Sequence, residues 1–265
     1  MTATAPIPAR HRMRQPRLAE MVSDALRERI LSGDLADGSM LPKQEELLEE
    51  FGVRLPPIRE ALRILETEGL ITVQRGNVGG AIVHRPQPSK AAYMLGLVLQ
   101  SRRATLQDVL QALITFEPSC AAACAARKDR AETVLPKLRA ILDEAKASVD
   151  DGERYTGLAR RFHVELVAGC GNEAMTQVVG ALEALWTTHV DTLARRVQQL
   201  GSFAEPRARE ASVAEHEAMY KAIKKGDHRL AEQLAREHYG HHNEAGWGDA
   251  LNVELVIDAA LLREL

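Results

Sequence analysis

Apolar residues recur every three or four positions along most of the chain, which is the spacing of a helix with one buried face. In the first third, this spacing predicts helices at Leu18–Leu31, at Gln44–Phe51 and from Pro56 or Pro57 onward. Two later runs, Leu70–Gln74 and Ala81–His84, are rich in β-branched residues, and the glycines between them are typical of a hairpin. Three helices followed by a hairpin predict a winged helix-turn-helix.

After Pro86 the pattern is helical throughout, and two prolines within residues 86–90 indicate a linker. The periodicity predicts seven further helices: Ala91–Ser101, Thr105–Arg127, Ala131–Asp150, Arg154–Ala168, Asn172–Leu200, Pro206–Lys225 and Asp227–Ala245. Pro118 is expected to kink or interrupt the second of these, because proline removes a backbone hydrogen bond. Short turns between helices favour antiparallel packing. The predicted fold class is mainly α, with a C-terminal all-α antiparallel helical bundle behind the winged helix-turn-helix.

The predicted domains are a flexible basic arm (1–17), the winged helix-turn-helix (18–85), a linker (86–90), an all-helical domain (91–248) and a C-terminal segment (249–265). Neither half of the chain is basic in bulk: residues 1–86 hold 12 Lys/Arg and 12 Asp/Glu, and residues 87–265 hold 22 and 25. Local charge is more informative. Four arginines and no acidic residue lie within the first 19 positions. Such an arm can neutralise DNA phosphates, and the alternative is a merely solvated tail.

The third predicted helix presents arginines on one side. Ile58, Ala61 and Leu65 share its apolar stripe, whereas Arg59 and Arg63 are displaced from it and point outward. An arginine on the second helix of a helix-turn-helix can reach the major groove and donate two hydrogen bonds to guanine. The pattern therefore indicates a sequence-specific DNA-binding protein.

Membrane and secretion signals are weak in this sequence. No uninterrupted apolar run approaches the roughly 20 residues that span a bilayer, so we expect no membrane partner. Residues 1–17 lack the apolar core of a secretory signal, so we expect a cytoplasmic location. The three cysteines, Cys120, Cys124 and Cys170, are interpreted as buried thiols, because disulfides are rare in a reducing compartment.

The N-terminal motifs resemble the DNA-binding signature of the GntR family over roughly residues 18–85. The matching residues are Leu41-Pro42, Leu47, Phe51-Gly52-Val53, Pro57-Ile58-Arg59-Glu60-Ala61-Leu62-Arg63, Leu65-Glu66 and Glu68-Gly69-Leu70. Beyond the linker, the chain is similar to the effector domain of the FadR subfamily, called FCD. That similarity rests on Phe162-His163, Gly171-Asn172, His216, Ala222-Ile223, Gly226-Asp227, Ala231 and His238.

The resemblance implies a double-stranded DNA operator as partner. The residues expected at DNA are Lys43, Gln44, Arg54, Pro56, Arg59, Arg63, Arg75 and Gly76. The chain departs from the family pattern at two places: Arg54-Leu55 stands in place of Ser-Arg, and Glu45 stands in place of an arginine. These departures indicate an operator sequence different from that of relatives. One such domain covers only a few base pairs, so we expect a homodimer on a palindrome.

The FCD resemblance also implies a metal site. His163, His216 and His238 match its histidines, and three imidazoles suit Zn, Ni, Fe or Mn as a divalent cofactor. The family's aspartate is Ala159 here, which weakens the site. Water or an effector oxygen fills the open position, or the metal has been lost and the cavity binds something else.

A small-molecule effector is the third expected partner. The residues assigned to its pocket are Glu117, Ala159, Trp186 and His189, although an ordinary core role is an alternative for Trp186. Leu113 stands where relatives often carry an arginine that grips an acidic effector. This difference favours a larger or more apolar ligand.

These inferences together predict a transcriptional regulator, specifically a repressor under the control of a metabolite, and no enzyme. The alternative is a metal-dependent hydrolase with a three-histidine site. His216-Glu217-Ala218-Met219-Tyr220 begins like the HExxH motif and then lacks its second histidine, which counts against the hydrolase. A helical scaffold without DNA-binding activity is disfavoured by the arginines of the third helix.

Overall fold

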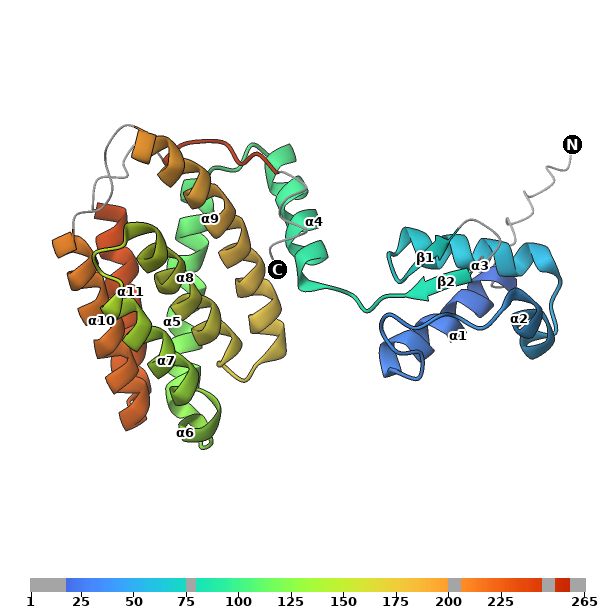
Figure 1. Cartoon of the computed structure of the whole chain (residues 1–265), viewed down its shortest axis with the longest axis horizontal. Helices are drawn as coiled ribbons and strands as arrows, with labels where there is room; N and C mark the ends of the chain where they lie inside the picture. The colour runs from blue at the N-terminus through green and yellow to red at the C-terminus, as the bar shows by residue number, and fades with distance from the viewer. Residues whose placement is uncertain (1–17, 75–79, 200–205, 245–250, 258–265) are drawn as a thin grey trace, which may run out of the picture. The chain divides into compact units, whose positions relative to one another are not determined.

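The computed structural model describes residues 18–74, 80–199, 206–244 and 251–257. The chain divides into two compact units, residues 1–86 and 87–265, each described here by itself (Figure 1). The predicted fold class is confirmed: three helices and a two-stranded sheet form the described part of the first unit, and the second is a helical bundle. The predicted basic arm at 1–17 and the wing residues Arg75 and Gly76 lie outside the described residues.

The first unit is a winged helix-turn-helix. Its elements are α1 (Leu18–Ser32), α2 (Gln44–Phe51), α3 (Leu55–Thr67), β1 (Ile71–Gln74) and β2 (Gly80–Val83). The strands pair antiparallel with Ile71 opposite Val83, and α1 packs against α3. The core is made of fully buried side chains such as Leu26, Ile58 and Leu65. Two apolar residues that follow the helical spacing of α1, Leu18 and Met21, are 54% and 56% exposed.

The start of α3 follows directly from its sequence. Gly52 ends α2 in the left-handed conformation with φ 61°, which glycine adopts without strain. Arg54 is then the N-cap residue of α3, and prolines occupy its first turn, where a missing N–H costs nothing. The helix buries Ile58, Ala61 and Leu65 and so fixes the direction of its other side.

The second unit contains eight helices among its described residues. They are α4 (Pro88–Ser101), α5 (Leu106–Ala126), α6 (Arg130–Thr133), α7 (Leu135–Ala147), α8 (Gly152–Ala168), α9 (Glu173–Gln199), α10 (Pro206–Lys225) and α11 (His228–Glu244). In Figure 1 the long helices of this unit run alongside one another. Their ends agree with the predicted ranges to within two residues, apart from α4, α6 and α7.

Three sequence predictions need correction in this unit. Residues 88–90, assigned to the linker, form the first turn of α4, because Pro88 is suited to that position. The single helix expected at 131–150 is divided into α6 and α7 at Val134, beside Pro136 in the first turn of α7. Conversely, α5 continues through Pro118 without interruption, held by buried residues on both sides of the proline.

Helix α5 is the central element of the bundle. It packs against α8, α9, α10 and α11, and its side chains Leu110, Leu113 and Cys120 are fully buried. Phe116 of the same helix is 45% exposed. Among the described helices, α5 has the length and composition of a membrane span. Its contacts with α8, α9, α10 and α11 indicate instead the core helix of the bundle.

Residues 251–257, which we name the C-terminal strap, cross the turn between α4 and α5. The backbone N–H of Leu106 donates to the carbonyl of Val253 at 3.0 Å, and that of Leu255 donates to the carbonyl of Ala104 at 2.9 Å. Leu251 and Leu255 are each 1% exposed and belong to the bundle core. The strap is the red segment near α4 and α9 in Figure 1.

Candidate metal centre

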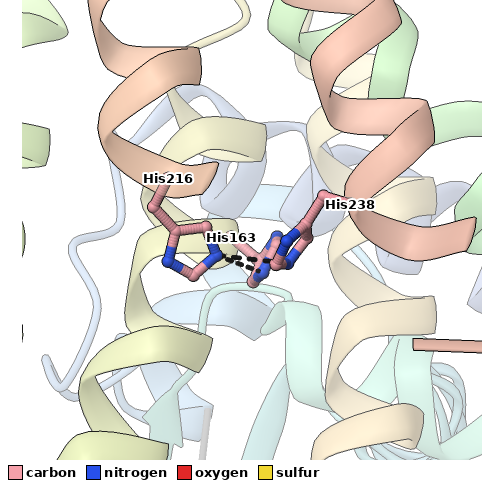
Figure 2. Close-up of side chains that lie close together, drawn as sticks. All are labelled: His163, His216 and His238. Carbon is pink, nitrogen blue, oxygen red and sulfur yellow. Dashed lines mark hydrogen bonds between the residues drawn. The ribbon is translucent and has the colours of Figure 1, made fainter. Parts of the chain in front are cut away.

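Three histidine side chains from three helices meet inside the bundle. His163 lies on α8, His216 on α10 and His238 on α11 (Figure 2). The Nε2 atom of His216 lies 3.2 Å from Nε2 of His163 and 3.2 Å from Nε2 of His238. All three residues are buried, and no other group of three potential metal ligands is this close together among the described residues. The structure thus brings together all three histidines named from the sequence.

Carboxylates orient two of the three imidazole rings. Nδ1 of His163 lies 2.6 Å from Oε1 of Glu117, and Nδ1 of His238 lies 2.6 Å from Oε2 of Glu215. Because a carboxylate accepts, each Nδ1 carries the hydrogen and each Nε2 turns a lone pair toward the centre. Burial lowers the pKa of His163, which keeps this ring neutral. Neutral imidazole is the form that binds metal ions.

Ala159 and its surroundings form an apolar wall on α8. Tyr155, Ala159 and His163 are each one helical turn apart and therefore share a face. Ala159 and Val213 of α10 pack against the cluster that contains Tyr155 and Leu158. Val213 also lines a groove of about 940 Å³ between α7 and α10. The described side chains of this wall carry no carboxylate in the place of the family's aspartate.

The remaining residues predicted for the effector pocket are dispersed. Glu117 is fully buried beside His163, as described above. Trp186 is partly buried and packs against the main core. His189 accepts a hydrogen bond at Nε2 from the backbone N–H of Val256 at 3.1 Å, and its Nδ1 lies 2.7 Å from the carbonyl of Leu185. His189 therefore holds the C-terminal strap and is not joined to the three histidines by a hydrogen bond in the described structure.

The predicted DNA-contacting residues lie on the surface of the first unit. Arg59 and Arg63 are exposed on α3, on the side away from its buried stripe, and Arg63 is 3.6 Å from Glu60. Arg54 and Pro56 are exposed at the start of the same helix. On α2, Lys43 is the exposed N-cap residue and Gln44 is half-buried. Arg59 and Arg63 are therefore accessible to a partner molecule.

The position of Glu217 does not suit the general base that the hydrolase alternative needs. Its carboxylate receives Nη1 of Arg139 at 2.9 Å, so an ion pair with α7 occupies it. A general base in a metallohydrolase needs to reach the metal-bound water. Glu217 is therefore held in a structural ion pair with Arg139 and does not act as a catalytic base.

A winged helix-turn-helix in the same chain as a helical bundle with three buried histidines is an organisation typical of DNA-binding transcriptional regulators. The family model "Bacterial regulatory proteins, gntR family" matches residues 18–79, and the model "FCD domain" matches residues 108–241. The chain belongs to the GntR family of bacterial regulatory proteins and carries an FCD effector-binding domain. It is a regulator and not an enzyme.

Individual relatives agree with this assignment. The chain is 23% identical over 209 residues to the transcriptional regulator LutR of Bacillus subtilis, covering 79% of this chain and 92% of LutR. It is 27% identical over 176 residues to the transcriptional repressor NanR of Cronobacter sakazakii, covering 65% of this chain and 66% of NanR. A solved GntR structure from Streptococcus agalactiae superposes with a TM-score of 0.66 at 22% identity, over 86% of this chain and all of that one. That superposition shows a shared fold.

Sequence reasoning missed three residues around the centre: Glu183, Glu215 and Tyr239. Glu183 is 2% exposed and Tyr239 is 4% exposed, and both are linked to Glu117. A signal for Glu183 is present, because it is the only charged residue between Val178 and Trp186. A lone carboxyl in an apolar helical run has to be either neutral or paired.

Proposed function

We propose that the FCD domain binds a divalent ion through Nε2 of His163, His216 and His238. The observation that carries this proposal is the convergence of three Nε2 atoms, with 3.2 Å between neighbours. Two ligands about 2.0 Å from a tetrahedral ion are about 3.3 Å apart. Zn, Ni, Fe and Mn all bind imidazole, and these borderline divalent ions suit a site of three nitrogen ligands.

The hydrogen atoms of the site support a cation at its centre. His163 and His238 each use their Nδ1–H on a carboxylate, so both offer only a lone pair at Nε2. His216 Nε2 lies 3.2 Å from each of these two Nε2 atoms. A cation at this point accepts a lone pair from all three nitrogens at once.

The proposed effector occupies the position that Ala159 leaves open. Three protein ligands leave room for one or more further donors, which water or an effector oxygen supplies. The wall beside it is apolar, formed by Ala159 and by the cluster of Tyr155 and Leu158. Leu113 is fully buried, so the arginine that relatives use for acidic ligands has no counterpart at that position. We therefore propose an effector with one metal-binding oxygen and an apolar body.

Elemental analysis of the purified, dialysed protein tests the metal centre. The expected result is close to one divalent ion per chain in the natural sequence and a large loss in His216→Ala. His228→Ala is the matched control, because His228 is an exposed residue at the start of α11. Equal metal content in the natural protein and in His216→Ala would refute the site.

At the DNA end, we propose that Arg59 reads a base in the major groove. Arg54 and Arg63 are assigned to base or phosphate contacts, and Arg75 to the groove or the DNA backbone beneath the wing. Replacing Arg59 by alanine is expected to weaken specific operator binding by about 1–3 kcal/mol, the size of a lost bidentate base contact. Lys128→Ala, an exposed cation of the helical unit, is the control for net charge. Unchanged affinity of Arg59→Ala in band-shift titrations at fixed salt would exclude this role.

We further propose that the protein is a homodimeric repressor on a palindromic operator and that effector binding releases it. A coupling of about 1–3 kcal/mol gives a 5- to 150-fold change in operator affinity. Genomic footprinting with the purified protein identifies the operator and the neighbouring genes. Metabolites of those genes are then added to the bound complex. Binding of one chain per site, or affinity that no such metabolite changes, would contradict this part of the proposal.

A further inference from the structure

A chain of buried polar groups extends from His163 into the core of the bundle. Oη of Tyr239 on α11 contacts Oε2 of Glu117 on α5 and lies 2.8 Å from Oε1 of Glu183 on α9. Glu117 in turn accepts from Nδ1 of His163. All four residues are buried. Four helices thus meet at one network.

The number of hydrogen atoms decides which carboxyl in this network donates. The Tyr239 hydroxyl lies near two carboxyls but has one hydrogen, so one carboxyl has to donate. Glu117 already accepts from Nδ1 of His163, so Glu183 is assigned as the donating carboxyl. The network therefore turns an accepting oxygen of Glu117 toward the ring of His163.

We infer that Tyr239 and Glu183 are positioning residues of the metal centre: they hold the Glu117 carboxylate, which sets the orientation and basicity of His163. The inference rests on the proposed metal site. Partners of this kind behind a metal-binding histidine change metal affinity about 10- to 100-fold when they are removed. The opposite arm of the site differs, because the Glu215 side chain behind His238 is 32% exposed and open to water.

The first test measures zinc affinity by competition with a chromogenic chelator, on the full-length chain. Tyr239→Phe keeps the ring and removes the hydroxyl, and zinc affinity is expected to fall 10- to 100-fold. Tyr220→Phe is the matched control, because Tyr220 is also buried in the bundle but its ring lies under Arg139. Its affinity is expected to stay within about twofold of the natural chain.

The second test separates positioning from a general loss of packing. Glu183→Gln keeps a neutral hydrogen-bonding group and is expected to retain zinc affinity within about threefold, whereas Glu183→Leu is expected to lose it. Glu117→Gln replaces the accepting carboxyl by an amide and is expected to lose affinity as Tyr239→Phe does. The thermal midpoint of each metal-free variant is measured in parallel, and a purely structural role predicts that affinity follows that midpoint.

The outcomes distinguish this inference from the proposed function. If Tyr239→Phe and Glu183→Leu bind zinc like the natural chain while His216→Ala does not, the positioning role is wrong and the metal site stands. If Glu183→Gln and Glu117→Gln lose affinity equally, the assignment of Glu183 as the donating carboxyl is wrong. If the natural chain binds no zinc, nickel, iron or manganese, the metal site is wrong and the inference is wrong with it.

Discussion

Replacement of Gly96 by alanine is expected to destabilise the helical unit. A Cβ at this position of α4 would lie 2.7 Å from Cδ1 of Ile257 and 2.9 Å from Cδ2 of Leu185. Alanine gains about 0.5–1 kcal/mol over glycine inside a helix. Overpacking a filled core costs about 1–3 kcal/mol. Leu185 is fully buried, so a shift of its side chain disturbs the core, and we expect a net loss of about 1–2 kcal/mol.

Urea unfolding followed by tryptophan fluorescence measures this effect. Both tryptophans of the chain, at 186 and 247, belong to the second unit, so the signal reports that unit. Gly157→Ala is the control, because a Cβ at Gly157 of α8 has no neighbour within 4 Å. It is expected to raise stability by about 0.5–1 kcal/mol. If Gly96→Ala stabilises the protein as much as Gly157→Ala does, the packing of the C-terminal strap on α4 is refuted.

Three further predictions concern the bundle. Ala159→Asp restores the carboxylate of the family pattern and is expected to raise zinc affinity at least tenfold, about 1.4 kcal/mol, in chelator competition; Ala168→Asp, at the exposed end of α8, is the control. Burial raises the pKa of the Cys124 thiol to about 12, so it should react with a thiol reagent at pH 9 only after unfolding, which fast labelling of the folded protein would contradict. The Thr105 backbone N–H lowers the pKa of Asp108, so the stability that Asp108 contributes at neutral pH should disappear as the pH falls through that lowered pKa. In urea unfolding, the free energies of unfolding of Asp108→Asn and of the natural chain should therefore converge in acid, and a constant difference between them would contradict the capping role.

Local pattern was enough to predict most helices but not the breaks that depend on neighbours. The apolar stripe of α3 is visible in the spacing of Ile58, Ala61 and Leu65, and the structure buries all three. The division at Val134 and the continuity of α5 through Pro118 depend on packing against other helices, which a local pattern does not contain. Tertiary contacts override local propensity at such points.

The candidate site shows the same limit. The three histidines are 53 and 22 residues apart in sequence, as counted from His216, and their spacing alone does not predict that they meet. The resemblance to a family supplied that expectation. Tyr239 and Glu183 were missed because each contributes one group to a network that forms only when α5, α9 and α11 pack together.

The C-terminal strap changes where an expressed fragment of the sensor module should end. The FCD match stops at residue 241, and the sequence pattern placed the domain boundary at 248, yet Leu251 and Leu255 fill the interior. Burying one leucine contributes about 1.5–3 kcal/mol, and a whole domain is stable by only about 5–15 kcal/mol. A fragment that ends at residue 241 or 248 lacks Leu251 and Leu255 and exposes the apolar surface on which they pack. Biochemical work on the isolated module therefore calls for a fragment that continues through Ile257.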